Sequence, residues 1–167
     1  IITGDTSSDL TFNDMKGEHT ATENFNATKI TDVLYPNDNT MVGKILRLRQ
    51  QYFLVSASLQ DIVKKQKAAG HDLHELSRYY CFQLNDTHPV IAIPELLRLL
   101  KAEGFTFEEA FKVCADTFNF TNHTIMAEAL EKWDVLALSD LLPDVYQEIV
   151  NCQRRLEADG LDGSKFY

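Results

Sequence analysis

Apolar residues recur every three or four positions over a long central part of the chain, residues 43–69. The recurring positions form one stripe, made of Ile45, Leu48, Tyr52, Val55, Leu59 and Ile62. This spacing predicts a single amphipathic helix, and Gly70 suits the position just beyond its last turn. Residues 71–79 have a mixed pattern that favours no particular element.

The second half of the chain alternates between strand-like and helix-like patterns. The patterns predict, in order, a buried strand over 80–85, helices over 94–103 and 106–116, a strand over 118–122, and helices from near Ile125 and over 143–157. Thr106 and Glu109 have the spacing of a capping box. A strand–helix–strand order favours parallel pairing with a right-handed crossover. The predicted fold class is therefore α/β and helix-rich, with parallel strands near 80–85 and 118–122.

Composition limits the classes of function. The 167 residues are 44% hydrophobic, which is enough for one core, and the formal net charge of −9 argues against a nucleic-acid binder. No apolar run is long enough for a membrane span. Cys81, Cys114 and Cys152 lie far apart in apolar contexts, so we expect buried free thiols in a reducing cytoplasm. The chain starts without Met, and we expect an internal piece of a longer protein.

Polar residues gather where each predicted strand ends. Asn85-Asp86-Thr87-His88 follows the first strand, and Thr121-Asn122-His123-Thr124 ends the second. Parallel strands bring their carboxyl ends to one edge of a sheet, where ligands bind in open α/β folds. Carboxylate, imidazole, amide and hydroxyl groups together suit a polyhydroxylated ligand such as a sugar. The N-terminus of the helix predicted near Ile125 is expected to face the same site.

Two other interpretations remain open for these clusters. Asn, Asp and Thr at strand ends also cap helices and close turns without binding any ligand. Asp86, His88 and His123 have the donor types of a facial metal triad, although no i,i+4 pair of histidines and no cluster of cysteines accompanies them. The sequence contains no phosphate-binding loop, dinucleotide fingerprint or nucleophile elbow.

Three segments, in order along the chain, resemble signatures of the α-glucan phosphorylases, the family of glycogen, starch and maltodextrin phosphorylases. They are LYPNDN (34–39) with GK (43–44) and LRLRQQYF (46–53), then QLNDTHP (83–89) with IPEL (93–96), then TNHT (121–124) with EALEKW (128–133). The resemblance covers residues 34–133 and extends more weakly to both ends. It implies that residues 1–167 are an internal segment of the N-terminal domain of a GT-B glycosyltransferase, in which two Rossmann-like domains face each other across a cleft.

The resemblance also implies an activity. The family transfers a terminal glucosyl unit from an α-1,4-glucan to phosphate and forms glucose 1-phosphate. It implies pyridoxal phosphate on a lysine of a C-terminal domain that this chain lacks, a homodimer, and a cytoplasmic enzyme. The present segment would supply the sugar-side wall of the active-site cleft and would be inactive alone. A non-catalytic glucan-binding module and a plain α/β scaffold are the alternatives.

Roles carry over only to matching positions. His123 is implied to contact the glucosyl residue, and a backbone carbonyl there would stabilise an oxocarbenium-like transition state. The resemblance implies that Asp86, Thr87, His88, Asn122, Glu128 and Ala129 bind the substrate. Asp38 and Asn39 match a mobile gating loop that would admit substrate and exclude water.

Some positions depart from the family pattern. Family members often have proline at the position of Ala127 and aromatic residues at those of Thr40 and Met41. The animal enzymes carry an Arg pair for nucleotide activation where this chain has Lys64-Lys65. Lysine keeps the positive charge but lacks the bidentate fork of arginine. We therefore expect no AMP switch, which fits a bacterial-type enzyme.

Overall fold

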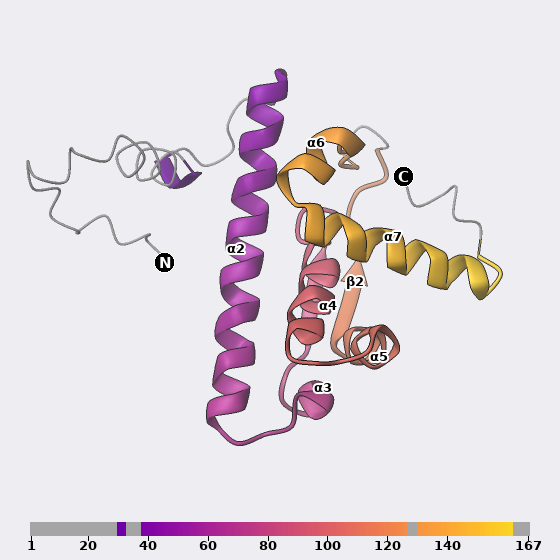
Figure 1. Ribbon diagram of the computed structural model, residues 1–167. Coiled ribbons are helices and arrows are strands. Elements are labelled where there is room, and N and C mark those ends of the chain that lie inside the picture. Colours follow the sequence, from indigo (N-terminus) through magenta and orange to yellow (C-terminus); the bar gives the residue numbers. More distant parts are fainter. Residues whose placement is uncertain (1–29, 33–37, 127–129, 162–167) are drawn as a thin grey trace, which may run out of the picture. The chain divides into compact units, whose positions relative to one another are not determined.

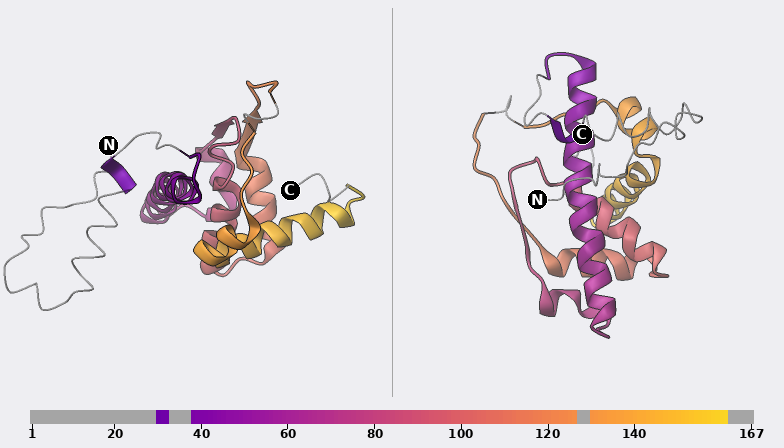
Figure 2. Two further views of the ribbon diagram at one scale, coloured as in Figure 1. Left: turned by 90° about the horizontal axis from the view of Figure 1, so that it is seen from above. Right: turned by 90° about the vertical axis from the view of Figure 1, so that its left-hand side faces the viewer.

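The computed structural model describes residues 30–32, 38–126 and 130–161. Its elements are, in order, α2 (Met41–Ala68), the 3₁₀ turn η2 (Leu73–Glu75), α3 (Leu76–Tyr79), β1 (Phe82–Asn85), α4 (Ala92–Ala102), α5 (Phe107–Thr117), β2 (Phe118–Thr121), α6 (Val135–Leu141) and α7 (Pro143–Ala158). Figure 1 labels the α-helices and β2. Figure 2 lets the reader follow the same elements from two further sides. The chain divides into two compact units, Ile1–Gln50 and Gln51–Tyr167, and the boundary falls inside α2.

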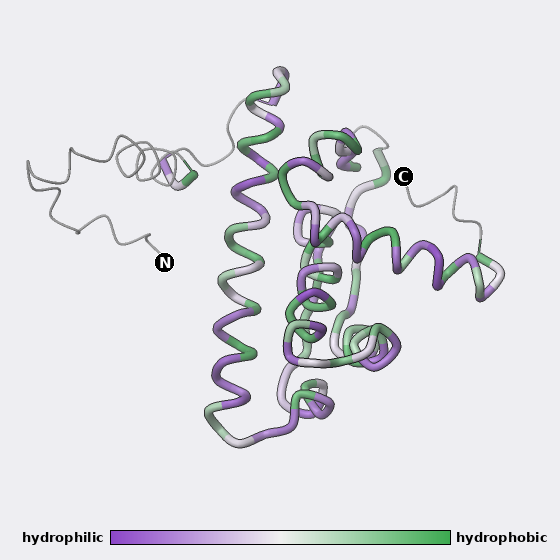
Figure 3. Tube along the Cα trace, viewed as in Figure 1, coloured by the Kyte–Doolittle hydropathy of each residue, from purple (hydrophilic) through white to green (hydrophobic). Residues whose placement is uncertain are grey.

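The long helix α2 confirms the prediction from the apolar stripe. Figure 3 shows hydrophobic and hydrophilic residues alternating along α2, as a helix with one apolar face requires. The helix ends as expected at Gly70, whose φ of +75° suits a residue without Cβ. The N–H of the next residue, His71, donates to the carbonyl of Gln66 over 3.1 Å, which gives the end the hydrogen bonding of a Schellman motif.

The helices α4 and α5 are also confirmed, with small shifts at their ends. α4 begins two residues earlier than predicted, and Pro94 lies in its first turn. Gly104, at φ +97°, follows its end. The capping box of α5 is complete, because Thr106 Oγ1 accepts the N–H of Glu109 over 3.3 Å and the Glu109 carboxylate accepts the N–H of Thr106 over 2.8 Å.

The two strands pair in parallel, as predicted. The register runs from Phe82 opposite Phe118 to Asn85 opposite Thr121. The expectation of a wholly buried first strand was wrong, because within β1 only Leu84 is buried. Side chains alternate between the two faces of a strand, so Leu84 turns to the core while its neighbours turn away.

The helix predicted from near Ile125 is absent at its expected start. Ile125 is exposed and lies in irregular chain, and the next helix along the described residues is α6, with Asp134 as its N-cap. Polar side chains offer the backbone other partners here: Asn122 Oδ1 accepts the N–H of Thr124 over 3.2 Å, and Thr124 Oγ1 accepts the N–H of Met126 over 3.3 Å. Such local bonds compete with helical ones. No helix N-terminus therefore follows β2 directly.

The core of the second unit is centred on α4. Leu96, Leu97 and Leu100 are fully buried, and both α5 and α7 pack against this helix. Figure 1 shows α7, in yellow, crossing α4, in agreement with those contacts. The other buried members of the cluster come from α2, η2, α3, β1, α4 and α5, and are Leu59, Val63, Leu73, Leu76, Leu84, Ala92, Ala110, Val113 and Cys114. No helix in the described part of the chain is long and apolar enough to cross a membrane.

The three cysteines differ in burial. Cys114 is buried, as expected, and Cys152 is only half-buried. The expectation was wrong for Cys81, which is exposed. Cys81 precedes β1, and its sulfur accepts a hydrogen bond of 3.1 Å from the side-chain amide of Asn119, itself exposed on β2. All three thiols are free.

Candidate functional site

The parallel register brings the two polar clusters together. Asn85 and Thr121 form the last strand pair, and the N–H of Asp86 donates to the carbonyl of Thr121 over 2.9 Å, one residue beyond it. The residues that follow each strand therefore leave the sheet at the same edge. This juxtaposition was predicted from the order of strands and helices alone, and it is confirmed.

Asp86 forms the turn at the end of β1. Its φ of +59° lies in the left-handed region, and no other non-glycine residue of the described chain has a positive φ. The conformation costs an ordinary residue about 1 kcal/mol, and Asp tolerates it better than most. The side chain is half-buried, and its Oδ1 accepts the backbone N–H of His123 over 2.7 Å. The carboxylate thus ties the first cluster to the second.

The imidazole of His123 is anchored to the same strand end. Its Nε2 lies 3.3 Å from Oδ1 of Asn85. An amide oxygen only accepts hydrogen bonds, so this contact places a proton on Nε2 and leaves Nδ1 as the acceptor of a neutral ring. His123 is otherwise exposed. Its ring is therefore held by the last residue of β1 and its main chain by the residue that follows, while one face of the residue stays open to a ligand.

A second link ties the first cluster to the chain beyond the second cluster, through a residue that sequence reasoning missed, Glu131. The N–H of Glu131 donates to Oγ1 of Thr87 over 3.3 Å, and Glu131 Oε1 lies 3.1 Å from Nδ1 of His88. The same Oε1 accepts a 2.6 Å hydrogen bond from the side chain of Gln51 on α2. Glu131 stands in the third segment of the family resemblance and Gln51 in the first, and this was the available signal for both residues.

A cavity of about 490 Å³ adjoins this second link. Polar groups of Gln51, Thr87, His88, Glu131 and Lys132 line one part of it. The rest is apolar, and is lined by Val90, Ile91, Pro94, Trp133, Val135, Leu138, Tyr146 and Ile149. Asp86 and His123 are not among the lining residues. A few convergent polar groups at an apolar hollow are typical of small-molecule sites.

Comparison with known proteins shows what kind of protein carries this arrangement. A family profile described as Carbohydrate phosphorylase matches residues 5–161. The chain belongs to this family. The membership confirms the resemblance inferred from the three signature segments.

The chain is 51% identical over 115 residues to Glycogen phosphorylase 2 of Dictyostelium discoideum. The matched region covers 68% of this chain and 12% of that protein. It is 47% identical over 137 residues to Glycogen phosphorylase of Haemophilus influenzae, covering 80% of this chain and 17% of the relative. It is 43% identical over 136 residues to Maltodextrin phosphorylase of Streptococcus pneumoniae, covering 81% of this chain and 18% of the relative. The chain thus spans less than a fifth of the length of these relatives.

The other residues that the family resemblance implies for substrate binding have different surroundings. Asn122 closes a turn by accepting the N–H of Thr124 with its side-chain oxygen, and its contact with substrate stays a prediction. Glu128 and Ala129 lie outside the described residues. Thr87 and His88 both contact Glu131, and their contact with substrate stays a prediction.

The expected gating residues, Asp38 and Asn39, belong to the first unit of the chain. Asp38 forms an ion pair with Arg47 of α2. Thr40, the next residue but one, caps α2 by accepting the N–H of Gly43 over 3.2 Å. The ion pair holds Asp38 to α2, and the role of Asp38 and Asn39 as a gate stays a prediction.

The described residues do not fit a pyridoxal phosphate site. Lys101 is half-buried and donates to Glu148 over 2.5 Å, and every other described lysine is exposed. A Schiff-base lysine needs an amine that loses its proton readily, which burial favours and an ion pair opposes. Nor do three His, Cys, Asp or Glu side chains of the described segments gather so as to hold a metal ion, so the facial-triad interpretation gains no support.

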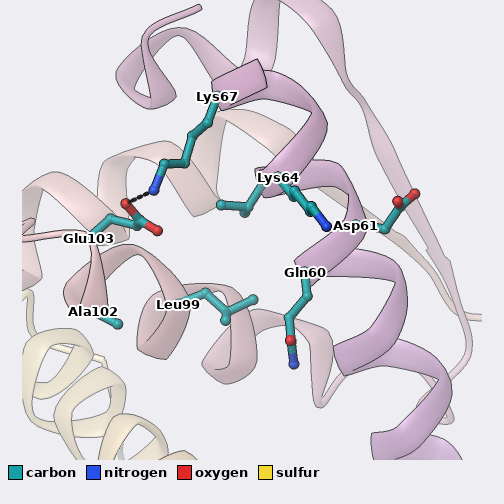
Figure 4. Close-up of a pocket in the computed structure, with 8 residues that line it drawn as sticks. Gln60, Asp61, Lys64, Lys67, Leu99, Ala102 and Glu103 are labelled. Carbon is teal, nitrogen blue, oxygen red and sulfur yellow. Dashed lines mark hydrogen bonds and ion pairs between the residues drawn. The ribbon is translucent and has the colours of Figure 1, made fainter. Parts of the chain in front are cut away.

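A second hollow, of about 560 Å³, lies beside Lys64, one of the two lysines that stand where animal family members carry an Arg pair. Figure 4 shows Lys67 reaching Glu103 across it, with Lys64 on α2. Lys65 is bound to Asp61 over 2.6 Å on the same helix. Carboxylates thus neutralise two of these three ammonium groups. The lack of a nucleotide switch stays a prediction.

Proposed function

We propose that this chain forms the sugar-side wall of the active-site cleft of an α-1,4-glucan phosphorylase. The whole protein would transfer a terminal glucosyl unit to inorganic phosphate and release glucose 1-phosphate. The names of the relatives, glycogen phosphorylase and maltodextrin phosphorylase, support this class of reaction. One structural observation carries the assignment of the site: the hydrogen bond from His123 to Asp86 holds the two strand-end clusters at one edge.

The reaction breaks the bond between C1 of the terminal glucose and O4 of the next residue. A phosphate oxygen forms the new bond to C1, and the proton that phosphate gives up goes to O4 of the shortened glucan. C1 carries positive charge in the transition state, because the old bond is largely broken before the new one is formed. Fixed dipoles near C1 lower the barrier without reorganising during the reaction.

His123 supplies such a dipole in this proposal, through its backbone carbonyl. The bond of its N–H to Asp86 fixes the main chain at this residue, and the contact of Nε2 with Asn85 fixes the ring. The remaining ring nitrogen, Nδ1, can accept a hydrogen bond from a sugar hydroxyl. Asp86 acts by orienting His123, and Thr87 and His88 contact the sugar beside it.

The remaining features of the proposal concern the whole protein. Residues 1–167 are taken as one segment of the N-terminal domain of a GT-B fold, and a separate C-terminal domain would hold pyridoxal phosphate on its own lysine. We further propose a cytoplasmic homodimer of bacterial type that acts on α-1,4-glucan and phosphate. Asp38 and Asn39 would close over the bound sugar, while Asn122, Glu128 and Ala129 complete its surroundings.

The test uses the full-length protein that the gene encodes, with maltoheptaose and phosphate as substrates. His123→Ala keeps the backbone carbonyl but removes the ring that contacts Asn85 and can accept from a sugar hydroxyl. It is expected to lower the rate of glucose 1-phosphate formation by roughly 10²-fold, the usual effect of losing one oriented polar group. The matched control is His71→Ala, since His71 stacks on Tyr79 away from both clusters. Its rate should stay within about twofold of wild type, as for a surface change remote from the site.

Three outcomes separate the alternatives. Turnover by the full-length protein that falls in His123→Ala and not in His71→Ala supports the proposal. Tight binding of maltoheptaose without turnover identifies a non-catalytic binding module. A full-length protein that neither binds nor converts the glucan leaves an α/β scaffold, and the proposal fails.

A further inference from the structure

Glu131 is held at both its main chain and its side chain. Its N–H is bound to Thr87, and its carboxylate oxygen Oε1 meets both Gln51 and His88. The side chain is only 11% exposed, whereas that of His88 is 49% exposed. A largely buried carboxylate in fixed contact with a half-exposed imidazole is the arrangement by which proteins orient a histidine that contacts something else.

The contact also selects one form of the ring. An ionised carboxylate has no hydrogen to donate, so the proton between Glu131 Oε1 and His88 Nδ1 must belong to the histidine. A neutral His88 then carries its single proton on Nδ1, and its Nε2 is an acceptor. Within the described residues, the structure gives Nε2 no hydrogen-bond partner. His88 also lines the 490 Å³ cavity, so a ligand there can approach the ring.

We propose that Glu131 is a positioning residue that holds His88 as the Nδ1–H tautomer, with Nε2 presented to a hydroxyl group of the ligand. Glu131 itself touches no ligand in this proposal; it acts through His88. The identity of the ligand as a sugar rests on the proposed function. The tautomer does not, because it follows from the contact between the two side chains.

A purely structural role for Glu131 is the competing explanation. In that case its hydrogen bond from Gln51, at 2.6 Å, would be the important one, since it connects α2 to the chain beyond β2. The two roles differ in what they predict for His88. Loss of Gln51 leaves the acceptor for Nδ1 in place, whereas loss of the Glu131 carboxylate removes it.

The experiment records long-range ¹H–¹⁵N spectra of the full-length protein labelled at histidine ring nitrogens, at about pH 8, where a free imidazole is neutral. The His88→Asn variant identifies the His88 signals by their disappearance. Wild type and Gln51→Leu are expected to show the Nδ1–H form. Glu131→Met, which keeps the volume and removes the acceptor, is expected to shift His88 towards the Nε2–H form that free imidazole side chains prefer in water.

Glu131→Gln serves as the conservative rescue. Its amide oxygen can still accept from Nδ1, so the Nδ1–H form should persist. An Nε2–H form in wild type overturns the proposal, even if Glu131→Met fails to fold. A His88 spectrum that is the same in wild type and in a folded Glu131→Met variant overturns it as well.

Kinetics provide a second readout. Loss of one neutral hydrogen bond to the sugar is worth about 1 kcal/mol, so Glu131→Met should raise KM for maltoheptaose about fivefold, with a smaller effect on kcat. Glu108→Gln removes the same charge from an exposed pair with Arg155 and should leave both constants unchanged. If kcat falls in Glu131→Met and KM does not rise, the positioning role is wrong. If the wild type has no activity, the proposed function fails while the spectra still decide the tautomer.

Discussion

The carboxylate of Asp86 accepts the backbone N–H of His123 over 2.7 Å, although the two residues are 37 positions apart in the sequence. The same aspartate has a left-handed backbone, with φ of +59°. One residue therefore both turns the chain away from β1 and holds the chain that leaves β2. These two properties can be separated by substitution.

Three variants of Asp86 are expected to differ in a fixed order of thermal stability. Asp86→Asn keeps an oxygen acceptor and a tolerance of positive φ, so it should unfold near the wild-type midpoint. Asp86→Gly keeps the backbone but loses the acceptor, at a cost of about 1 kcal/mol. Asp86→Ala loses both and should cost about 1 kcal/mol more than glycine. Differential scanning calorimetry of the full-length variants measures the order, and a glycine variant less stable than the alanine variant would contradict it.

Glu95 provides a second prediction, because this carboxylate is fully buried between α2 and α4. It accepts hydrogen bonds from Tyr52, Ser56 and Arg98, at 2.6 to 3.1 Å. Glu95→Ala leaves these donors unpaired and should lower the free energy of unfolding by about 3 kcal/mol, the lower end for a broken buried ion pair, since Arg98 remains partly exposed.

The matched control for Glu95 is Asp116→Ala, which breaks an exposed pair with Lys112 on one helix. Exposed pairs at this spacing contribute about 0.5 kcal/mol or less. Urea unfolding of both variants should therefore separate them clearly. Equal losses in the two variants would mean that the buried cluster adds nothing beyond a surface ion pair.

The three thiols should react with iodoacetamide in the order Cys81, Cys152, Cys114. Burial raises the pKa of Cys152 to about 11 and that of Cys114 further, so almost none of either is thiolate at neutral pH. Cys81 is exposed. Peptide mapping by mass spectrometry after timed quenching gives the order, and labelling of Cys114 before Cys81 in folded protein would refute it.

The raised pKa of Cys152 also makes the free energy of unfolding depend on pH. Above its ordinary value of 9.0 the unfolded chain loses this proton while the folded chain keeps it up to about pH 11. The stabilisation is therefore complete below pH 9 and is lost as the pH rises towards 11. Between about pH 9 and pH 11, the Cys152→Ala variant should lose less stability than wild type. The iodoacetamide labelling of Cys114 described above measures this loss.

Local signals predicted the elements well, because their causes lie within a few residues. Thr106 and Glu109 bind each other's backbone, and Gly70 adopts its positive φ without a steric cost because it has no Cβ. The meeting of the strand ends followed from the geometry of parallel pairing. The prediction of a helix from near Ile125 was wrong because the apolar pattern takes no account of the neighbouring hydroxyl and amide groups. These groups bind the backbone in non-helical turns.

The missed residues depend on contacts between distant parts of the chain. Glu131 meets His88 across 43 positions, and no pattern around either residue records that contact. Cys81 misled for a different reason. Its aromatic neighbours, Tyr80 and Phe82, suggested burial, yet adjacent residues in extended chain point to opposite faces. An apolar neighbour is therefore weak evidence for the burial of a residue in a strand.

The segment from His123 to Glu131 is fastened at its two ends to three consecutive residues, Asp86, Thr87 and His88. Its anchors consequently stay together whatever chain connects them. The entropy of closing a loop changes slowly with its length, so residues could be exchanged or inserted between the anchors at little cost. Substitutions and insertions between the anchors could in this way reshape this edge while both histidines keep their places.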